Sequence, residues 1–123
     1  MHILIVEENR DLGRLWARHL EREGHSVEVV TSQVEAIDAL RHRAVQVIVL
    51  DVVLSQGSAL AVSDYASYRW PDARIVFVTN TTFFSDGSIF RHASNACAYL
   101  QSDTRPEDLA MMVSHYAAAA EAG

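Results

Sequence analysis

One apolar run, residues 45–54, dictates the fold class of this chain more strongly than any other segment. It reads VQVIVLDVVL, is rich in β-branched residues and is too short to cross a membrane. Such a run is typical of a strand that is buried on both faces at the centre of a parallel sheet. An isolated buried carboxylate is costly, so its single acid, Asp51, is expected at the end of the strand, facing a polar or metal-bearing crevice. A simpler interpretation is that Asp51 only ends the strand and caps the segment that follows.

Strand-like and helix-like patterns alternate along the rest of the chain. Four further short strands are predicted: Ile3–Val6, Ser26–Val30, Arg74–Val78 and Cys97–Leu100. Five helices are predicted: from Asn9 to Gly24, from Ser32 to Leu40, from Ala59 to Tyr68, from Ser85 to Phe90 and from Thr104 to Tyr116. This alternation predicts an α/β fold with a doubly wound, five-stranded parallel sheet of order 2-1-3-4-5 and helices on both faces.

Apolar residues at helical spacing give the predicted helices an inward face. The inward residues are expected to be Leu12, Leu15, Trp16 and Leu20 in the first helix, Val34, Ile37 and Leu40 in the second, and Leu109, Met112, Val113 and Tyr116 in the last. Asn9 and Ser32 are expected to cap the first two helices. The adjacent Met111 and Met112 are interpreted as core filling rather than part of a cofactor site.

Length and composition limit the function classes. The 123 residues predict a single domain, 1–123, with no output domain after the last helix. The net charge of −6 argues against a basic face that binds nucleic acid. Since no signal peptide or membrane span is recognisable, we expect a cytoplasmic protein that binds no membrane. The single Cys97 fits a reducing compartment, and the six histidines lack the spacing of a zinc site.

Three acids are predicted to meet at the carboxyl edge of the sheet. Glu7 and Glu8 follow the first strand and Asp51 ends the third, and these strands are neighbours in the predicted order. Two charges ~4 Å apart repel by about 4 kcal/mol at an effective dielectric of about 20, so a cation is expected to offset the repulsion. Oxygen ligands from a few carboxylates suit Mg²⁺, which keeps several waters. The alternative is that Glu7 and Glu8 are solvated loop acids.

Four segments together resemble the receiver domains of two-component response regulators, from Ile3 to about Val113. The first, residues 3–8, is similar to the opening strand and acidic pair of that family, although the family usually has Asp at both acidic positions. The others are Val47–Asp51, similar to the phospho-acceptor strand, Val76–Thr79, similar to the strand that ends in the switch residue, and Ala98–Leu100, similar to the segment with the switch aromatic. The order and spacing of these segments are more specific than any one of them.

The resemblance implies a flavodoxin-like receiver fold and a phospho-acceptor signalling domain, not an enzyme beyond self-catalysed phosphoryl transfer. The implied donor is a histidine kinase or phosphotransfer protein, and the implied output passes to a downstream protein. The resemblance also leaves room for a homodimer through the last two strand–helix units. The implied residue roles are Asp51 as phospho-acceptor, Glu8, Asp51 and the Val53 carbonyl as Mg²⁺ ligands, Glu7 acting on the metal through water, Thr79 as switch residue and Tyr99 as switch aromatic.

The chain departs from the family where the family has a Lys-Pro pair. These positions are Ser102 and Asp103, and all ten of the Lys and Arg residues are arginines. Arg91 and Arg105 are candidates to supply the missing charge, although a guanidinium is not equivalent to an ammonium point charge. Two interpretations remain: a phosphorylatable receiver, favoured because the acceptor and both switch residues are retained, and a pseudo-receiver that acts as a phosphorylation-independent interaction module. A flavin- or nucleotide-binding domain is disfavoured, because no glycine-rich loop follows the first strand.

Overall fold

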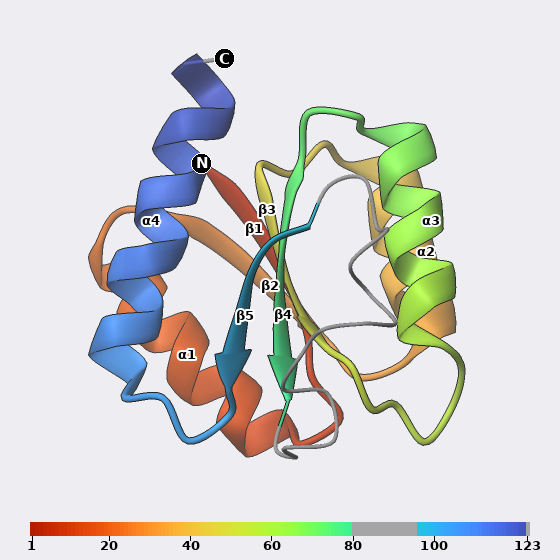
Figure 1. Cartoon of the computed structure of the whole chain (residues 1–123), viewed down its shortest axis with the longest axis horizontal. Helices are drawn as coiled ribbons and strands as arrows, with labels where there is room; N and C mark the ends of the chain where they lie inside the picture. Colours follow the sequence, from red (N-terminus) through yellow and green to blue (C-terminus); the bar gives the residue numbers. More distant parts are fainter. Residues whose placement is uncertain (80–95, 123) are drawn as a thin grey trace.

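A computed structural model describes residues 1–79 and 96–122 of the chain (Figure 1). The strands are β1 (His2–Val6), β2 (Ser26–Val30), β3 (Val47–Asp51), β4 (Arg74–Thr79) and β5 (Ala96–Gln101). The helices are α1 (Arg10–Arg22), α2 (Gln33–His42), α3 (Ala59–Arg69) and α4 (Pro106–Ala122). The predicted strands and four of the predicted helices are therefore confirmed. The helix predicted from Ser85 to Phe90 lies outside the described residues.

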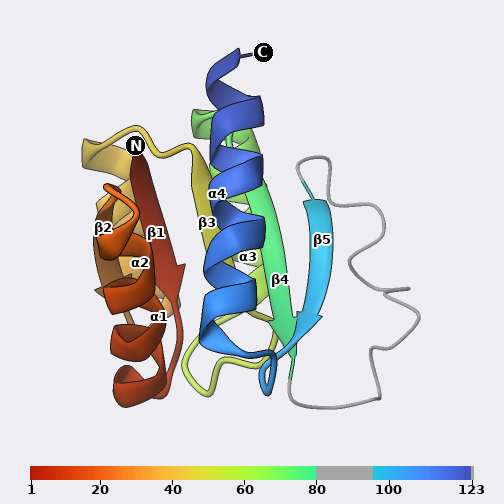
Figure 2. The same cartoon turned by 90° about the vertical axis from the view of Figure 1, so that its left-hand side faces the viewer.

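The strands form one parallel sheet in the predicted order, β2-β1-β3-β4-β5. Helices α1 and α4 cover one face of the sheet, and α2 and α3 cover the other (Figures 1 and 2). Strand β3 lies at the centre, and its residues 47–50 are fully buried, as the continuous apolar run indicates. Among the described residues, no helix is long and apolar enough to span a bilayer.

Two hydrophobic clusters hold the helices against the sheet. The α1/α4 cluster includes Ile5, Trp16, Leu20, Val49, Val78, Leu109 and Val113. The α2/α3 cluster, on the opposite face, includes Leu4, Ala36, Leu40, Ile48, Leu50, Val62 and Phe77. Alternate residues of a strand point to opposite faces, so the central strands contribute to both clusters. Full burial of one large apolar side chain contributes about 1.5–3 kcal/mol, and these clusters therefore fix the sheet that positions Asp51.

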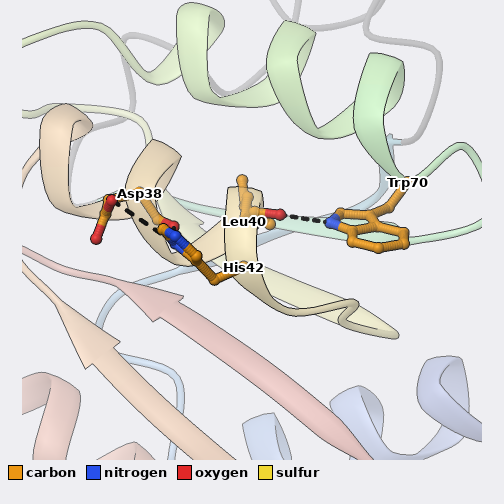
Figure 3. A network of polar contacts seen from close by, with 4 residues as sticks. All are labelled: Asp38, Leu40, His42 and Trp70. Atoms are coloured by element: carbon orange, nitrogen blue, oxygen red, sulfur yellow. Dashed lines mark hydrogen bonds and ion pairs between the residues drawn. The ribbon is translucent and has the colours of Figure 1, made fainter.

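Trp70 joins the end of α3 to α2 (Figure 3). Its indole Nε1 donates a hydrogen bond of 2.7 Å to the carbonyl oxygen of Leu40. That carbonyl is in the last turn of α2, where carbonyl groups lack partners within the helix. On the same helix, His42 Nδ1 lies 2.9 Å from the carbonyl oxygen of Asp38 and 3.7 Å from its carboxylate (Figure 3). The bond from Trp70 thus links α3 to α2, whereas the contacts of His42 with Asp38 lie within α2 at its exposed surface.

Side-chain oxygens cap three of the helices. Asn9 and Ser32 accept hydrogen bonds from the third N–H group after them, as predicted, and Ser58 caps α3 in the same way. Gly24 follows α1 with a φ of +93°, a left-handed conformation that favours glycine.

The expected inward face of α2 is wrong at Val34, which is 78% exposed. Ala36 and Leu40 face the sheet instead. A residue two positions from Ala36 lies about 200° around the helix, so Val34 points to the opposite side. Leu15 of α1, also expected inside, is exposed too.

The interpretation of the methionine pair as core filling is also wrong. Met111 is 67% exposed and Met112 is 38% exposed. The buried side of α4 is formed by Leu109, Val113 and Ala117, which follow one another at intervals of four residues and so share one face.

Candidate functional site

Asp51 is the last residue of β3 and stands at the carboxyl edge of the sheet, as predicted. The register of β1 against β3 pairs Val6 with Leu50. The next residue of each segment is Glu7 or Asp51, so these two acids leave the sheet side by side. The N–H of Val53 donates a hydrogen bond of 3.0 Å to Oδ1 of Asp51, which fixes this carboxylate in a local turn.

Glu7 is buried at this edge, with only 3% of its surface exposed. Its N–H donates to the carbonyl of Val30, and its Oε2 accepts the N–H of Asn9, both at 3.0 Å. Gly13 of α1 lies close by, and a Cβ at that position would approach the Cβ of Glu7 to 3.5 Å. The interpretation of both glutamates as solvated loop acids is therefore wrong for Glu7.

The pKa of Asp51 is raised to about 7, and burial is the largest cause of the rise. A side-chain hydrogen bond with Glu7 and the negative charges of Glu7 and Glu8 contribute to the same rise, whereas the hydrogen bond from the Val53 N–H opposes it. Without a cation, Asp51 is therefore only partly ionised near neutral pH.

Glu8 faces the loop that follows β3. Its side chain is exposed, and its Oε2 accepts a hydrogen bond of 3.0 Å from the N–H of Ser55. Its charge still acts on Asp51. The structure thus brings Glu7 and Asp51 into contact and places Glu8 at the rim, bound to the loop.

The donor set at this edge fits a hard divalent cation. Two carboxyl groups are held together where burial disfavours a second negative charge, and a cation would relieve that repulsion. Within the described residues, no three His, Cys, Asp or Glu side chains form a group that could hold a metal ion. A cation would therefore need backbone oxygens and water as well as carboxylates, which is the coordination that Mg²⁺ usually has in proteins.

The two predicted switch residues lie on neighbouring strands. Asp51 pairs in register with Val78, so Thr79, which is buried, lies one residue further along β4. Tyr99 of β5 pairs with Phe77, and their rings stack with centroids 5.4 Å apart and planes 16° apart. Tyr99 is 40% exposed. Phe77 and Thr79 are two residues apart on β4, so their side chains project from the same face of the sheet. Since Tyr99 pairs with Phe77, Tyr99 projects from this face too.

Ser102, at the position of the family's lysine, follows β5 directly. Its N–H donates a hydrogen bond of 2.8 Å to the carbonyl oxygen of Thr79. Arg105, a candidate substitute for the lysine, is exposed and forms an ion pair with Glu107, with Nη2 2.6 Å from Oε1. Arg91, the other candidate, lies outside the described residues.

One contact of the site was not predicted from the sequence. Gln33, the first residue of α2, binds the far end of the loop that follows Asp51, through hydrogen bonds to Gln56 and Ser58. A glutamine at the start of a helix, more than 20 residues from its partners, gives no motif by which sequence reasoning could find it.

The parallel sheet, with Asp51 at the end of its central strand and the buried Glu7 beside it, is the arrangement that the resemblance to receiver domains predicts. Residues 3–113 match the family of response regulator receiver domains, and the chain belongs to this family. It is thus a receiver domain of a two-component system. Receiver domains are signalling domains that interact with histidine kinases and downstream effectors, and they typically bind Mg²⁺.

Two curated relatives share part of this sequence. The acid tolerance regulatory protein ActR of Rhizobium meliloti (strain 1021) is 34% identical over 77 residues, which are 63% of this chain and 40% of ActR. The uncharacterized transcriptional regulatory protein YkoG of Bacillus subtilis (strain 168) is 38% identical over 61 residues, which are 50% of this chain and 27% of YkoG. The matched stretch thus spans less than half the length of each relative.

Solved receiver structures share the fold. A CheY-like response regulator receiver domain protein from Methanospirillum hungatei JF-1 superimposes with a TM-score of 0.87 at 22% identity, covering 98% of this chain and 95% of that one. The response regulator TrrA of Thermotoga maritima, solved in complex with Mg²⁺ and BeF, has a TM-score of 0.79 at 20% identity, covering 94% and 97%. At these identities the likeness shows the fold alone.

Proposed function

We propose that this chain is a phosphoryl-accepting receiver in which Asp51 takes a phosphoryl group in the presence of Mg²⁺. The observation that supports this function best is the contact between Asp51 and the buried Glu7 at the carboxyl end of the central strand. Holding two acids together in a buried site costs folding free energy. A site for a cation and a transferred phosphoryl group is a function that accounts for such a pair.

In the proposed step, one carboxylate oxygen of Asp51 forms a bond to phosphorus while the P–N bond of a donor phosphohistidine breaks. The imidazole nitrogen keeps the electron pair of the broken bond, and the product is an aspartyl phosphate. Asp51 must be ionised to act as the nucleophile, so its raised pKa keeps it partly inactive at neutral pH until positive charge arrives. The residues therefore favour transfer only when the acidic pair is neutralised.

The proposed cation ligands are Glu8, Asp51 and the carbonyl oxygen of Val53, with Glu7 acting through water. One oxygen of Glu8 already accepts the N–H of Ser55, and its other oxygen is the proposed ligand. When bound, Mg²⁺ supplies charge neutralisation and orients the phosphoryl oxygens, which is most of what phosphoryl transfer requires.

Thr79 and Tyr99 are proposed to transmit the change. Thr79 lies one residue beyond the β4 partner of Asp51, so its hydroxyl is the proposed donor to a phosphoryl oxygen. Tyr99 lies on the same face of the adjacent strand and is half exposed, so its ring has room to change position when Thr79 moves. The proposed result is a reshaped surface around β5 and α4, through which a downstream protein or a second copy of the chain would bind.

A pseudo-receiver is the second candidate, and the lysine position favours it. Ser102 brings no charge, and Arg105 is engaged by Glu107 at the surface. Among the described residues, a phosphoryl group would then be held by Mg²⁺ and neutral donors. In that case the chain would act as an interaction module in the cytoplasm whose partner binds the unphosphorylated surface.

Mass spectrometry after incubation with acetyl phosphate and Mg²⁺ tests the proposal. The expected result is the addition of one phosphoryl group that hydroxylamine removes, as it does from an acyl phosphate, and that is absent in Asp51→Asn. An adduct that persists in Asp51→Asn would place the acceptor elsewhere. If neither acetyl phosphate nor a phosphorylated histidine phosphotransfer protein gives an adduct, the pseudo-receiver is the correct function.

A further inference from the structure

The loop between Asp51 and α3 is tied to other parts of the site near its start. The N–H of Val53 binds the Asp51 carboxylate, and the N–H of Ser55 binds Glu8, each at 3.0 Å. The segment that includes the proposed carbonyl ligand, Val53, therefore depends on the acidic residues themselves for its position.

The far end of the same loop is held by Gln33 from the neighbouring layer. The side-chain Oε1 atom of Gln33 accepts a hydrogen bond of 2.8 Å from the N–H of Ser58. The backbone N–H of Gln33 donates a hydrogen bond of 3.3 Å to the carbonyl oxygen of Gln56. The first N–H groups of a helix have no partner within the helix, and here one of them binds the loop. Gln33 thus holds both a donor and an acceptor of the loop backbone.

Gly57 lies between these two hydrogen bonds and packs directly against Gln33. Its φ is +109°, which favours glycine, and a Cβ at this position would collide with the Cβ of Gln33 and lie 2.6 Å from its Oε1. The loop therefore approaches Gln33 as closely as a backbone without a side chain allows.

The side chain of Gln33 is not needed to start α2. Ser32 caps the helix by accepting the N–H of Glu35, and Glu35 in turn accepts hydrogen bonds from the N–H and hydroxyl of Thr31. The amide of Gln33 consequently serves the loop rather than its own helix.

We propose that Gln33 is a positioning residue for the Asp51 site, because it fixes the loop that presents the Val53 carbonyl and the Ser55 N–H. The functional part of this inference rests on the function proposed for Asp51, whereas the anchoring of the loop does not. Each residue of a free loop loses conformational entropy when it is ordered for binding. A loop already held by Gln33 has less to lose, so it binds a cation more tightly.

Amide hydrogen exchange and Mg²⁺ titration of the full chain test this role. The test variant, Gln33→Met, keeps the length of the side chain and removes the acceptor. We expect amide exchange to accelerate at Ser58 and also at Ser55 and Val53, and Mg²⁺ affinity to fall, each by roughly 2- to 10-fold for the loss of one hydrogen bond. Gln33→Glu keeps an acceptor oxygen and should retain slow exchange. The control, Val34→Ala, changes an exposed neighbour on the same helix and should alter neither measurement.

Two results would overturn the inference. If exchange accelerates at Ser58 alone while Ser55, Val53 and the Mg²⁺ affinity stay as in the wild type, Gln33 acts only locally. If all three amides exchange as in the wild type, Gln33 does not hold the loop. A wild-type chain that binds no Mg²⁺ and accepts no phosphoryl group would refute the proposed function instead, and exchange at Ser55 and Val53 would still decide whether Gln33 positions the loop.

Discussion

The N–H of Ser102 and the carbonyl oxygen of Thr79 form a hydrogen bond of 2.8 Å between the segment after β5 and the end of β4. This bond fixes the residue at the family's lysine position beside the proposed switch residue, at the same edge of the sheet as Asp51. Ser102, the residue at the family's lysine position in the sequence, therefore lies at the edge of the site and brings no charge to it.

Replacing Ser102 by lysine should strengthen binding of the phosphoryl mimic beryllofluoride. Hydrogen bonds to a charged group contribute roughly 1.5–3 kcal/mol, or about one to two powers of ten in affinity. The gain should be clearest when Asp103→Pro accompanies Ser102→Lys, because this pair restores the family's sequence. Titration followed by the amide NMR shifts of Thr79 and Tyr99 measures both affinity and switching.

The matched control for this experiment is Ser102→Met, which adds length without charge and should leave the affinity unchanged. A wild-type chain that binds beryllofluoride and switches as fully as Ser102→Lys would show that another cation, such as Arg91 or Arg105, fills the role of the lysine.

Asp51→Asn should stabilise the metal-free chain at pH 7.5, because it removes the repulsion between the acids. The gain should be on the order of 2 kcal/mol, which is less than the ~4 kcal/mol that Coulomb's law gives for two charges ~4 Å apart at a dielectric of ~20. Because the folded pKa is raised from 3.8 to about 7, the folded state keeps a proton that the unfolded state releases. Stability should therefore fall as the pH rises through this window, and the fall should be smaller in Asp51→Asn. Denaturant unfolding in EDTA measures both effects.

Mg²⁺ should raise the melting temperature of the wild type and should do so less in Asp51→Asn. Asp64→Asn, which removes an exposed acid of α3, is the control and should behave as the wild type in both experiments. Equal melting temperatures for wild type and Asp51→Asn, with and without Mg²⁺, would mean that Glu7, Glu8 and Asp51 do not form one site.

His25 should make the fold less stable in mild acid. Burial lowers its pKa below 6.5, the positive N-terminus lowers it further, and Glu23 partly opposes them. Its Nε2 lies 2.8 Å from the hydroxyl of Ser114 on α4, and its Nδ1 is buried without a hydrogen-bond partner among the described residues. The unfolded state therefore takes up the proton first, and stability is lost as the pH falls through 6.5 towards the folded pKa.

The variant that tests this is His25→Gln, compared in an Asp51→Asn background so that the acidic pair does not contribute. His25→Gln should remove a loss of less than about 1 kcal/mol between pH 7 and pH 5, since solvent screens a partly exposed group. Unchanged pH dependence in this variant would assign the loss to other groups.

Gly57→Ala should destabilise the chain by about 1–3 kcal/mol, because alanine is strained at a φ of +109° and its Cβ meets Gln33. Gly24→Ala is the control, since Gly24 also has a positive φ but a Cβ there would have no atom within 4 Å. The difference between the two variants in chemical denaturation measures the contact with Gln33. Equal losses would mean that the loop moves away from Gln33 at no cost.

The fold was predictable because the spacing of apolar residues along the sequence follows from which side chains are buried. The run around Asp51 has no polar alternation, and the structure buries both faces of β3. The same reasoning failed at Val34 and Met112, which are apolar and near helical spacing but lie off the buried face. A short helix with a single row of small buried residues, such as Ala36, gives too weak a pattern to fix its rotation about its own axis.

The sequence predicts which acids lie at the edge of the sheet, but it does not predict which of them contact one another. Strand order alone places Glu7, Glu8 and Asp51 at one edge. Successive residues of a strand point to opposite faces, so the register of β1 decides which glutamate faces Asp51. In this register Glu7 is buried, and Glu8 accepts the N–H of Ser55. The hydrogen bonds between Gln33 and the loop after Asp51 include a backbone–side-chain contact, and such a contact leaves no sequence pattern.

The two tryptophans are divided between the two sides of the sheet, which gives each layer its own fluorophore. Trp16 is fully buried in the α1/α4 cluster, and Trp70 packs against the α2/α3 cluster. Replacing either one by phenylalanine leaves a single tryptophan, and its emission, excited selectively over that of the tyrosines, reports on one layer only. The order in which the two layers assemble around β3 during refolding can thus be recorded optically, without any label, by comparing the time courses of the two single-tryptophan chains.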